Sequence, residues 1–215
     1  MRILQKLMRV GFHLLYHEFA FAYDWVAAAV SLGRWTNWIR TVIPFIEGSP
    51  VLEIGSGPGH LQSDLKKLDF QSHGLDESRQ MIKLARKRLK ANGARISNLT
   101  RGRAARLPYR NNAFRTILST FPSEYIFDPA TLKEIHRVLA SDGRFIILPA
   151  AWHVGHGLLE RTLAWVFHVT GETPGPFEII TNRIKTIVGY SGFKVDSHKI
   201  ETQASLLLVL VASKL

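Results

Sequence analysis

Residues 51–61 read VLEIGSGPGHL, an apolar run with one acidic residue that leads directly into a glycine-rich turn. The run Val51–Gly55 is typical of a buried β-strand. Glycines at positions 55, 57 and 59 let the backbone turn sharply and approach a ligand closely, because no Cβ intervenes. A helix is expected to begin near Gly59, so its free N–H groups would face the same crevice and favour a carboxylate there. This stretch therefore predicts the first strand–turn–helix unit of a ligand-binding α/β domain.

Short apolar runs alternate with helical patterns from about residue 50 onward. Such alternation indicates a parallel sheet covered by helices on both faces. The last two runs, joined by a short turn, predict an antiparallel hairpin. The predicted fold is α/β, a Rossmann-like three-layer sandwich whose seven-stranded, mostly parallel sheet ends in that hairpin. We predict strands at Val51–Gly55, Ser72–Asp76, Ile96–Thr100, Thr116–Thr120, Arg144–Pro149, Phe193–Ile200 and Ser205–Ser213, and helices at His60–Leu68, Arg79–Asn92 and Pro129–Leu139.

Two of these helices carry signals at their ends. Ser78 precedes the helix Arg79–Asn92 as an N-cap, and Gly93 follows it as a left-handed residue that ends it. The helix that ends at Leu139 is expected to stop before a turn at Ser141–Gly143, with glycine at its tip.

The length of 215 residues fits one domain, and no repeat or linker divides the chain. We predict an N-terminal helical extension over residues 1–48 and a ligand-binding domain over residues 49–215. The absence of cysteine excludes disulfides, thiolate nucleophiles and cysteine-ligated zinc. The longest apolar runs, Trp25–Leu32 and Ala204–Ala212, are shorter than the roughly 18 residues that a membrane span needs. Since the first residues also lack a signal-peptide pattern, the expected location is cytoplasmic.

The acidic residues around the turn narrow the class of ligand. In a dinucleotide-binding G-x-G-x-x-G pattern the third glycine would fall at His60, and Glu53 would place a negative charge near a pyrophosphate, so NAD is disfavoured. Asp76 ends the second strand, where a carboxylate can accept hydrogen bonds from both ribose hydroxyls. The expected ligand has an adenosine-like sugar, a cationic part and no diphosphate. S-adenosylmethionine fits this description; an ordinary strand–helix turn without a ligand is the alternative.

Four stretches over residues 51 to about 150 resemble, in family order, the motifs of class I S-adenosylmethionine-dependent methyltransferases. The closest patterns are those of ubiquinone/menaquinone-biosynthesis and small-molecule methyltransferases of the type 11 group. The stretches are Val51–Leu61, similar to motif I; Gly74–Ser78 with Met81, similar to the D-x-S signature; Leu107–Tyr109 with Ala113–Phe114, similar to LPF…SFD; and Glu134–Leu139 with Asp142–Arg144, similar to the EI-x-RVL turn into strand five.

The resemblance implies that the glycine loop holds the methionine part of S-adenosylmethionine and that Asp76 holds the ribose. Arg103 stands where the family has an acid that binds the adenine amino group, and arginine cannot accept that bond. The backbone of Ala104 is therefore expected to make it. Arg115 also replaces a family aspartate, and Met81 is expected either beside the adenine or in the core. The expected cofactor contacts are Glu53, Gly55, Ser56, Gly57, Gly59, Asp76, Glu77, Met81, Arg103, Ala104 and Thr120.

Methyl transfer from a sulfonium depends mostly on positioning the acceptor. A general base is needed only if the acceptor carries a proton that must leave. The ends of strands four and five should line the acceptor pocket. There His153 and His156 are the best base candidates, because histidine titrates near neutral pH; a solvated or structural role is the alternative. Glu124 and Tyr125 are weaker candidates, and no metal is expected from two histidines alone.

The net charge of +11 predicts attraction to polyanions, either nucleic acid or an anionic membrane surface. Residues 79–115 contain twelve basic side chains and no acidic one. The first 19 residues show a basic amphipathic pattern, which predicts a helix that covers the active site as a lid or lies in a membrane interface. A second apolar helix is expected at Leu158–Val169, either enclosing the acceptor or filling the core.

Together these features predict an S-adenosylmethionine-dependent methyltransferase for a small, apolar or lipid-like acceptor, with peripheral contact at the inner membrane face left open. An RNA methyltransferase is the main alternative, prompted by the charge. Residues 119–125 (STFPSEY) count against it, since they lack the acidic-Pro-Pro-aromatic motif of enzymes that methylate base amino groups. Arg103 and Arg115 keep open a second alternative, a non-catalytic methyltransferase-like binding protein.

Overall fold

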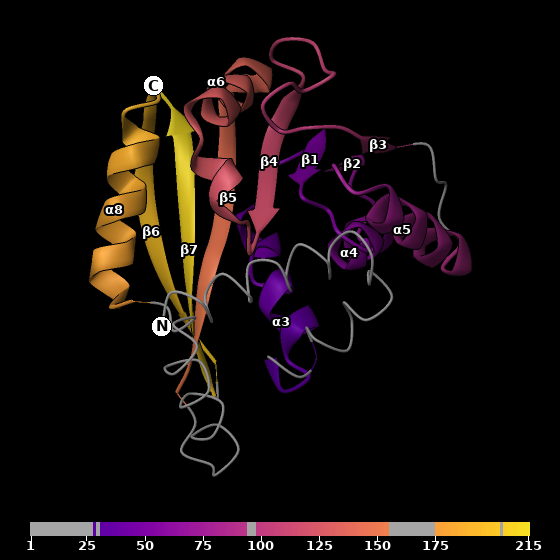
Figure 1. Ribbon diagram of the computed structural model, residues 1–215, viewed down its shortest axis with the longest axis horizontal. Coiled ribbons are helices and arrows are strands. Elements are labelled where there is room, and N and C mark those ends of the chain that lie inside the picture. The colour runs from indigo at the N-terminus through magenta and orange to yellow at the C-terminus, as the bar shows by residue number, and fades with distance from the viewer. Residues whose placement is uncertain (1–27, 29–30, 94–97, 155–174, 203) are drawn as a thin grey trace, which may run out of the picture.

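The computed structural model describes residues 28, 31–93, 98–154, 175–202 and 204–215, which form one sheet with helices on both faces (Figure 1). The sheet has seven strands in the order β3-β2-β1-β4-β5-β7-β6. Pairing is parallel from β3 to β5 and antiparallel for β5–β7 and β6–β7, which confirms the predicted sheet and hairpin. The strands are β1 (Val51–Ile54), β2 (Ser72–Asp76), β3 (Leu99–Arg101), β4 (Phe114–Thr120), β5 (Leu139–His153), β6 (Phe193–Glu201) and β7 (Ser205–Lys214).

Two large apolar cores lie one on each face of the sheet, and a small cluster of Ile82, Ala85, Leu89 and Leu99 holds α5. β1 contributes to both large cores, because its side chains alternate: Leu52 and Ile54 face one core and Val51 the other. α6 and α8 pack on the first core, and α3 and α4 on the second (Figure 1). The helices are α3 (Trp35–Arg40), α4 (His60–Lys67), α5 (Arg79–Ala91), α6 (Pro129–Val138) and α8 (Phe177–Gly189), with 3₁₀ turns η2 (Ile43–Phe45) and η3 (Glu124–Phe127).

The predicted ends of α5 are confirmed. The Ser78 side chain accepts a hydrogen bond from the backbone N–H of Met81 at 3.3 Å, as an N-cap does. Gly93 has a φ of 69°, the left-handed backbone that ends a helix.

The predicted turn at Ser141–Gly143 is wrong. These residues lie inside β5, which begins at Leu139 directly after α6. The pairing of β4 with β5 shifts from Phe114↔Leu139 to Thr116↔Arg144, so the residues between form a bulge. Glycine is required there because a Cβ on Gly143 would lie 2.9 Å from the Arg115 carbonyl oxygen. The glycine that suggested a turn instead allows two strands to approach closely.

Helix α8 was not predicted, although its sequence carries a helical signal. Its buried residues Thr181, Ile184 and Val188 are spaced three and four apart, which places them on one face against the first core. The expected helices over residues 1–19 and Leu158–Val169 lie outside the described residues, and the boundary between residues 48 and 49 stays a prediction. Among the described residues, no helix is long and apolar enough to cross a membrane.

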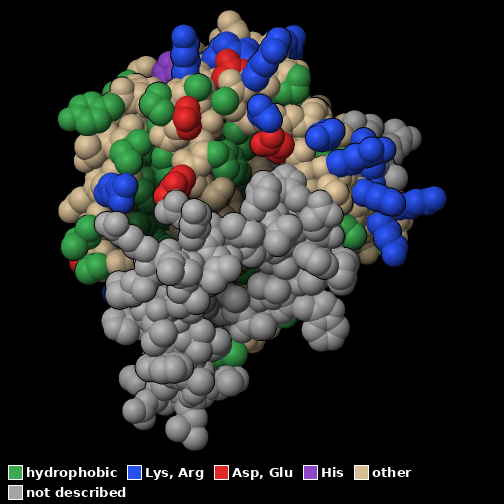
Figure 2. Space-filling model, in the orientation of Figure 1, with side chains coloured by type: hydrophobic (Ala, Val, Ile, Leu, Met, Phe, Trp, Pro, Cys, Tyr) green, Lys and Arg blue, Asp and Glu red, His purple; other side chains and the backbone are tan. Residues whose placement is uncertain are grey.

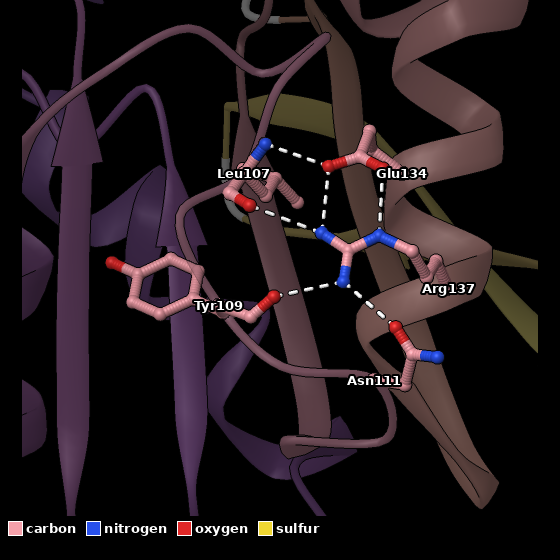
Figure 3. Close-up of polar contacts among 5 residues, drawn as sticks. All are labelled: Leu107, Tyr109, Asn111, Glu134 and Arg137. Carbon is pink, nitrogen blue, oxygen red and sulfur yellow. Dashed lines mark hydrogen bonds and ion pairs between the residues drawn. The ribbon is translucent and has the colours of Figure 1, made fainter.

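Arg137 of α6 joins the segment that follows β3 to the helix layer (Figure 3). Its guanidinium pairs with both carboxylate oxygens of Glu134 at 2.7 Å. It also donates to the carbonyls of Leu107 and Tyr109 and to the side chain of Asn111. Glu134 in turn accepts from the Leu107 N–H at 2.8 Å. One arginine therefore satisfies the polar groups of a loop that has no strand partners.

Replacing Arg137 with lysine is expected to lower the free energy of unfolding by about 2 kcal/mol, because an ammonium keeps the charge but cannot span the same partners. Denaturant unfolding monitored by circular dichroism measures the change. Arg183→Lys is the matched control, since Arg183 is exposed on α8 and makes no ion pair with the described residues. Equal stabilities of the two variants would contradict a structural role for the network.

Candidate functional site

The glycine loop between β1 and α4 is a tight turn built on the neighbouring strand. The N–H groups of Gly55 and Ser56 both donate to the Leu75 carbonyl of β2, at 2.8 and 3.0 Å. Gly55, Gly57 and Gly59 all have positive φ values, of 74°, 51° and 78°. Side chains other than glycine rarely adopt this backbone, so the turn depends on the predicted glycine spacing.

The three glycines differ in what surrounds them. A Cβ on Gly59 would lie 2.8 Å from the Ala85 Cβ, so this glycine allows α5 to pack against the loop. A Cβ on Gly55 would lie 2.4 Å from the Tyr125 hydroxyl. Among the described residues, nothing lies within 4 Å of the position of a Cβ on Gly57. The open side of the loop is therefore at Gly57, with the Tyr125 hydroxyl at its border.

Asp76 ends β2 beside this open side. One carboxylate oxygen accepts from the Gly57 N–H and the other from the Ser78 N–H, both at 2.8 Å. The acid therefore connects the glycine loop with the start of α5. Its backbone carbonyl also accepts from the Gly102 N–H at 3.0 Å, so the segment after β3 reaches the same place. The fold thus brings together the glycine loop and Asp76, the two features of the sequence that indicated a ligand site.

Glu53 lies behind the loop and is 2% exposed. Burial raises the pKa of its carboxyl from an ordinary 4.5 to about 8; the hydrogen bond from Gln62 opposes this and the charge of Asp76 adds to it. Gln62 of α4 donates to this carboxyl at 2.8 Å. At neutral pH the group is mostly protonated, and a cationic ligand nearby would favour its ionised form.

Ser56 lies in the glycine loop with its side chain against Gly74 of β2. Its hydroxyl is buried and has no hydrogen-bond partner among the described residues. The open space at Gly57 and the carboxylate of Asp76 fit the amino-acid and ribose parts of S-adenosylmethionine.

Of the residues expected near the adenine, some are exposed and others are buried. Glu77 and Arg103 form an exposed ion pair with 2.7 Å between Oε1 and Nε, and Arg101 donates to the Glu77 carbonyl. The arginine that replaces the family acid is therefore held by an acid on the neighbouring segment. Ala104 is buried beside it in the first core. Met81 is 0% exposed in α5.

On the acceptor side, the structure brings Tyr125 to the glycine loop. Thr120, half-buried at the end of β4, pairs with Leu148 of β5. His153 lies five residues beyond Leu148 on β5, roughly 16 Å farther along the strand. The centre of its ring lies 5.3 Å from the centre of the Trp38 ring of α3. His156 lies outside the described residues. Among the described residues no group of three His, Asp or Glu side chains could hold a metal.

From the sequence alone, Tyr125 is a weaker candidate than His153 and His156, because the order of residues after β4 does not predict that η3 lies over Gly55. That placement follows from Ile126, which is fully buried in the first core and turns the segment after β4 back over the sheet. The order of the chain shows that Tyr125 follows β4 but not which way the segment turns.

Comparisons with known proteins agree with this geometry. The family profile described as "Methyltransferase domain" matches residues 51–143. A demethylmenaquinone methyltransferase from Symbiobacterium thermophilum is 31% identical over 64% of this chain and 58% of its own length. The ubiquinone/menaquinone biosynthesis C-methyltransferase of Geotalea uraniireducens is 27% identical over 59% of this chain and 57% of its own. Phosphoethanolamine N-methyltransferase 2 of Haemonchus contortus, solved in complex with S-adenosyl-L-methionine, is similar in fold, with a TM-score of 0.59 at 17% identity over 91% of this chain and 56% of that chain.

Residues 51–143 are thus similar in sequence to a methyltransferase domain, and the chain has the fold of solved S-adenosylmethionine-dependent methyltransferases. The two relatives in sequence are named as a demethylmenaquinone methyltransferase and a ubiquinone/menaquinone biosynthesis C-methyltransferase, and the match spans less than two thirds of their length.

Proposed function

We propose that this chain binds S-adenosylmethionine and transfers its methyl group to a small quinone-like acceptor. The observation that carries the first part is the hydrogen bond between the Asp76 carboxylate and the Gly57 N–H at the open side of the glycine loop. The second part is supported by the names of the two relatives, which act in menaquinone and ubiquinone synthesis. A quinone-like acceptor refines the apolar or lipid-like acceptor expected from the sequence.

The residues of the loop have distinct roles in this proposal. Asp76 accepts hydrogen bonds from the ribose hydroxyls, and the glycine loop holds the amino-acid part. Glu53, when ionised, compensates the positive charge of the ligand across the loop. S-adenosylmethionine supplies a methyl group on a sulfonium, which is a good leaving group. The protein mainly has to hold the acceptor in line with that group.

Tyr125 is the side chain best placed to hold the acceptor. Its hydroxyl lies at Gly55, beside the open part of the loop, and its ring is partly exposed. We infer that this hydroxyl hydrogen-bonds an oxygen of the acceptor, orienting the ring carbon that receives the methyl group. Methylation of a ring carbon forms a C–C bond and breaks a C–H bond, so the proton of that carbon has to leave after the transfer. His153 and His156 stay the candidate bases that take it up.

Tyr125→Phe is expected to lower kcat about ten-fold while the Kd for S-adenosylmethionine changes by less than about three-fold, because one orienting hydrogen bond is lost and the loop is retained. Steady-state kinetics and calorimetric titration measure the two quantities. Tyr190→Phe is the control, since Tyr190 is exposed after α8. A Tyr125→Phe variant with unchanged kcat would remove this residue from the acceptor site.

The activity is tested with methyl-labelled S-adenosylmethionine and a reduced naphthoquinone without a ring methyl group, in detergent. We expect label in the organic phase only when the quinone is reduced, since the reduced ring is electron-rich. Label in added RNA would instead support the RNA methyltransferase alternative. Binding of S-adenosylmethionine with no transfer to either class would contradict the proposed acceptor, and no binding by a folded protein would favour the non-catalytic alternative.

Contact with an anionic membrane face is proposed as the route to such an acceptor. Arg79, Lys83, Arg86, Lys87 and Lys90 are exposed on α5 and make no ion pair with described residues. Figure 2 shows basic side chains gathered over this side of the molecule. We expect co-sedimentation with phosphatidylglycerol vesicles that weakens steeply between 50 and 300 mM salt, values chosen because the Debye length falls from about 14 to about 6 Å. Equal sedimentation with neutral vesicles would contradict it.

A further inference from the structure

A cavity of about 520 Å³ lies between α3, α4 and α5, on the side of the glycine loop away from the sheet. Its volume falls within the range of small-ligand sites, roughly 300–1,000 Å³. Nine of its twelve lining residues are polar or charged, which suits a charged ligand better than a quinone-like acceptor. The cavity therefore differs in chemistry from a site for an apolar acceptor, although it borders the glycine loop.

The charge of this cavity is strongly positive. Arg40, Lys67, Lys87 and Arg88 line it together with one acid, Asp64. Arg40 binds both oxygens of Asp64, at 2.8 and 3.2 Å, and Lys67 lies 4.0 Å from the same carboxylate. Among the described residues that line the cavity, one negative charge therefore faces four positive ones. These basic side chains are exposed or partly exposed, and they border one groove together.

The wall of the cavity is part of the cofactor loop. Pro58 and His60, on either side of Gly59, line it. Arg88 donates to the Pro58 carbonyl, and Gly59 packs directly on Ala85 of α5. A molecule bound to Lys87 and Arg88 would thus contact the residues that determine the shape of the loop. This contiguity is a physical route for coupling between the two sites.

We propose that this cavity binds a phosphate-bearing ligand and that its occupation changes the affinity of the glycine loop for S-adenosylmethionine. Guanidinium and ammonium groups that surround a pocket match the oxygens of a phosphate or diphosphate. The coupling rests on the proposed function, whereas the anion site does not. The phosphate is carried either by a soluble compound or by a lipid headgroup, which share this chemistry.

Calorimetric titration of the full chain with inorganic pyrophosphate tests the anion site without S-adenosylmethionine. We expect a single saturable event that Lys87→Ala weakens at least five-fold. Lys90→Ala should change it less than two-fold, because Lys90 is exposed on the same helix but does not line the cavity. No binding at millimolar pyrophosphate, or equal losses in the two variants, would overturn the proposal.

Titration with S-adenosylmethionine in saturating pyrophosphate tests the coupling. We expect the Kd to change at least three-fold in the wild type and in Lys90→Ala, whereas Lys87→Ala should need at least five-fold more pyrophosphate for the same change. By linkage S-adenosylmethionine should change pyrophosphate affinity by the same factor. An unchanged Kd for both ligands would overturn the coupling. If S-adenosylmethionine fails to bind at all, the proposed function fails while the pyrophosphate result stands by itself.

Phosphatidylglycerol vesicles distinguish the source of the phosphate. A headgroup in the cavity predicts that Lys87→Ala loses more vesicle binding than Lys90→Ala and that pyrophosphate competes with vesicles. If the natural ligand is soluble, Lys87→Ala and Lys90→Ala should lose equal, small amounts of vesicle binding, because each removes one charge from the general attraction. Pyrophosphate binding should still be weakened only in Lys87→Ala.

Discussion

Replacing Asp76 with alanine is expected to weaken S-adenosylmethionine binding about 100-fold, or roughly 2.7 kcal/mol. A charged acceptor that binds two ribose hydroxyls contributes about this much. The change also removes the acceptor for the Gly57 and Ser78 N–H groups, so part of the loss comes from a loosened loop. Calorimetric titration of both proteins measures the effect.

Two further variants separate these contributions. Asp76→Asn keeps one carbonyl oxygen for the loop and is expected to lose less affinity than alanine does. Asp196→Ala is the matched control, because Asp196 is exposed on β6 at the far edge of the sheet. Wild-type affinity in a folded Asp76→Ala variant would mean that the ribose binds elsewhere.

In the wild type, the free energy of unfolding is expected to fall by several kcal/mol between pH 4.5 and about 8 because of Glu53. Replacing Glu53 with glutamine should remove this pH dependence. The pKa of this carboxyl is about 8 in the folded protein, raised by burial, against 4.5 as its ordinary value. Between these two pH values the folded state holds a proton that the unfolded state releases, so stability falls as pH rises through this window and levels off above about 8. Glutamine carries no such proton and removes this slope.

Denaturant unfolding at pH 5, 7 and 9 measures this difference. We expect Glu53→Gln to gain on the wild type as pH rises and to match it most closely at pH 5. Glu178→Gln, which changes an exposed acid on α8, should follow the wild type throughout. If Glu53→Gln and the wild type remained parallel over this range, the buried carboxyl would have an ordinary pKa.

The same carboxyl links cofactor binding to pH. A cationic ligand favours the ionised form of Glu53, so binding below about pH 8 should release a proton, and affinity should rise from pH 6 to pH 8. Titration in buffers of different ionisation enthalpy measures the released proton. In Glu53→Gln the release should be absent.

Much of the fold was predictable because its signals are local. The spacing of apolar residues located the strands, Ser78 and Gly93 marked the ends of α5, and the glycines required a left-handed turn. The bulge in β5 was not predictable, since glycine favours both a turn and a close approach of two strands. At Gly143 the carbonyl of Arg115, distant in sequence, decides between them.

The sequence by itself determined the class of sheet, the glycine loop and the acid that ends the second strand, because each depends on short-range backbone preferences and on strand order. Only the tertiary structure decided which side chains meet. It placed Tyr125 at Gly55, His153 against Trp38, and Arg40 against Asp64 beside a basic cavity. Such contacts depend on how far a strand extends and how helices pack, which are set by the whole core and not by any one segment.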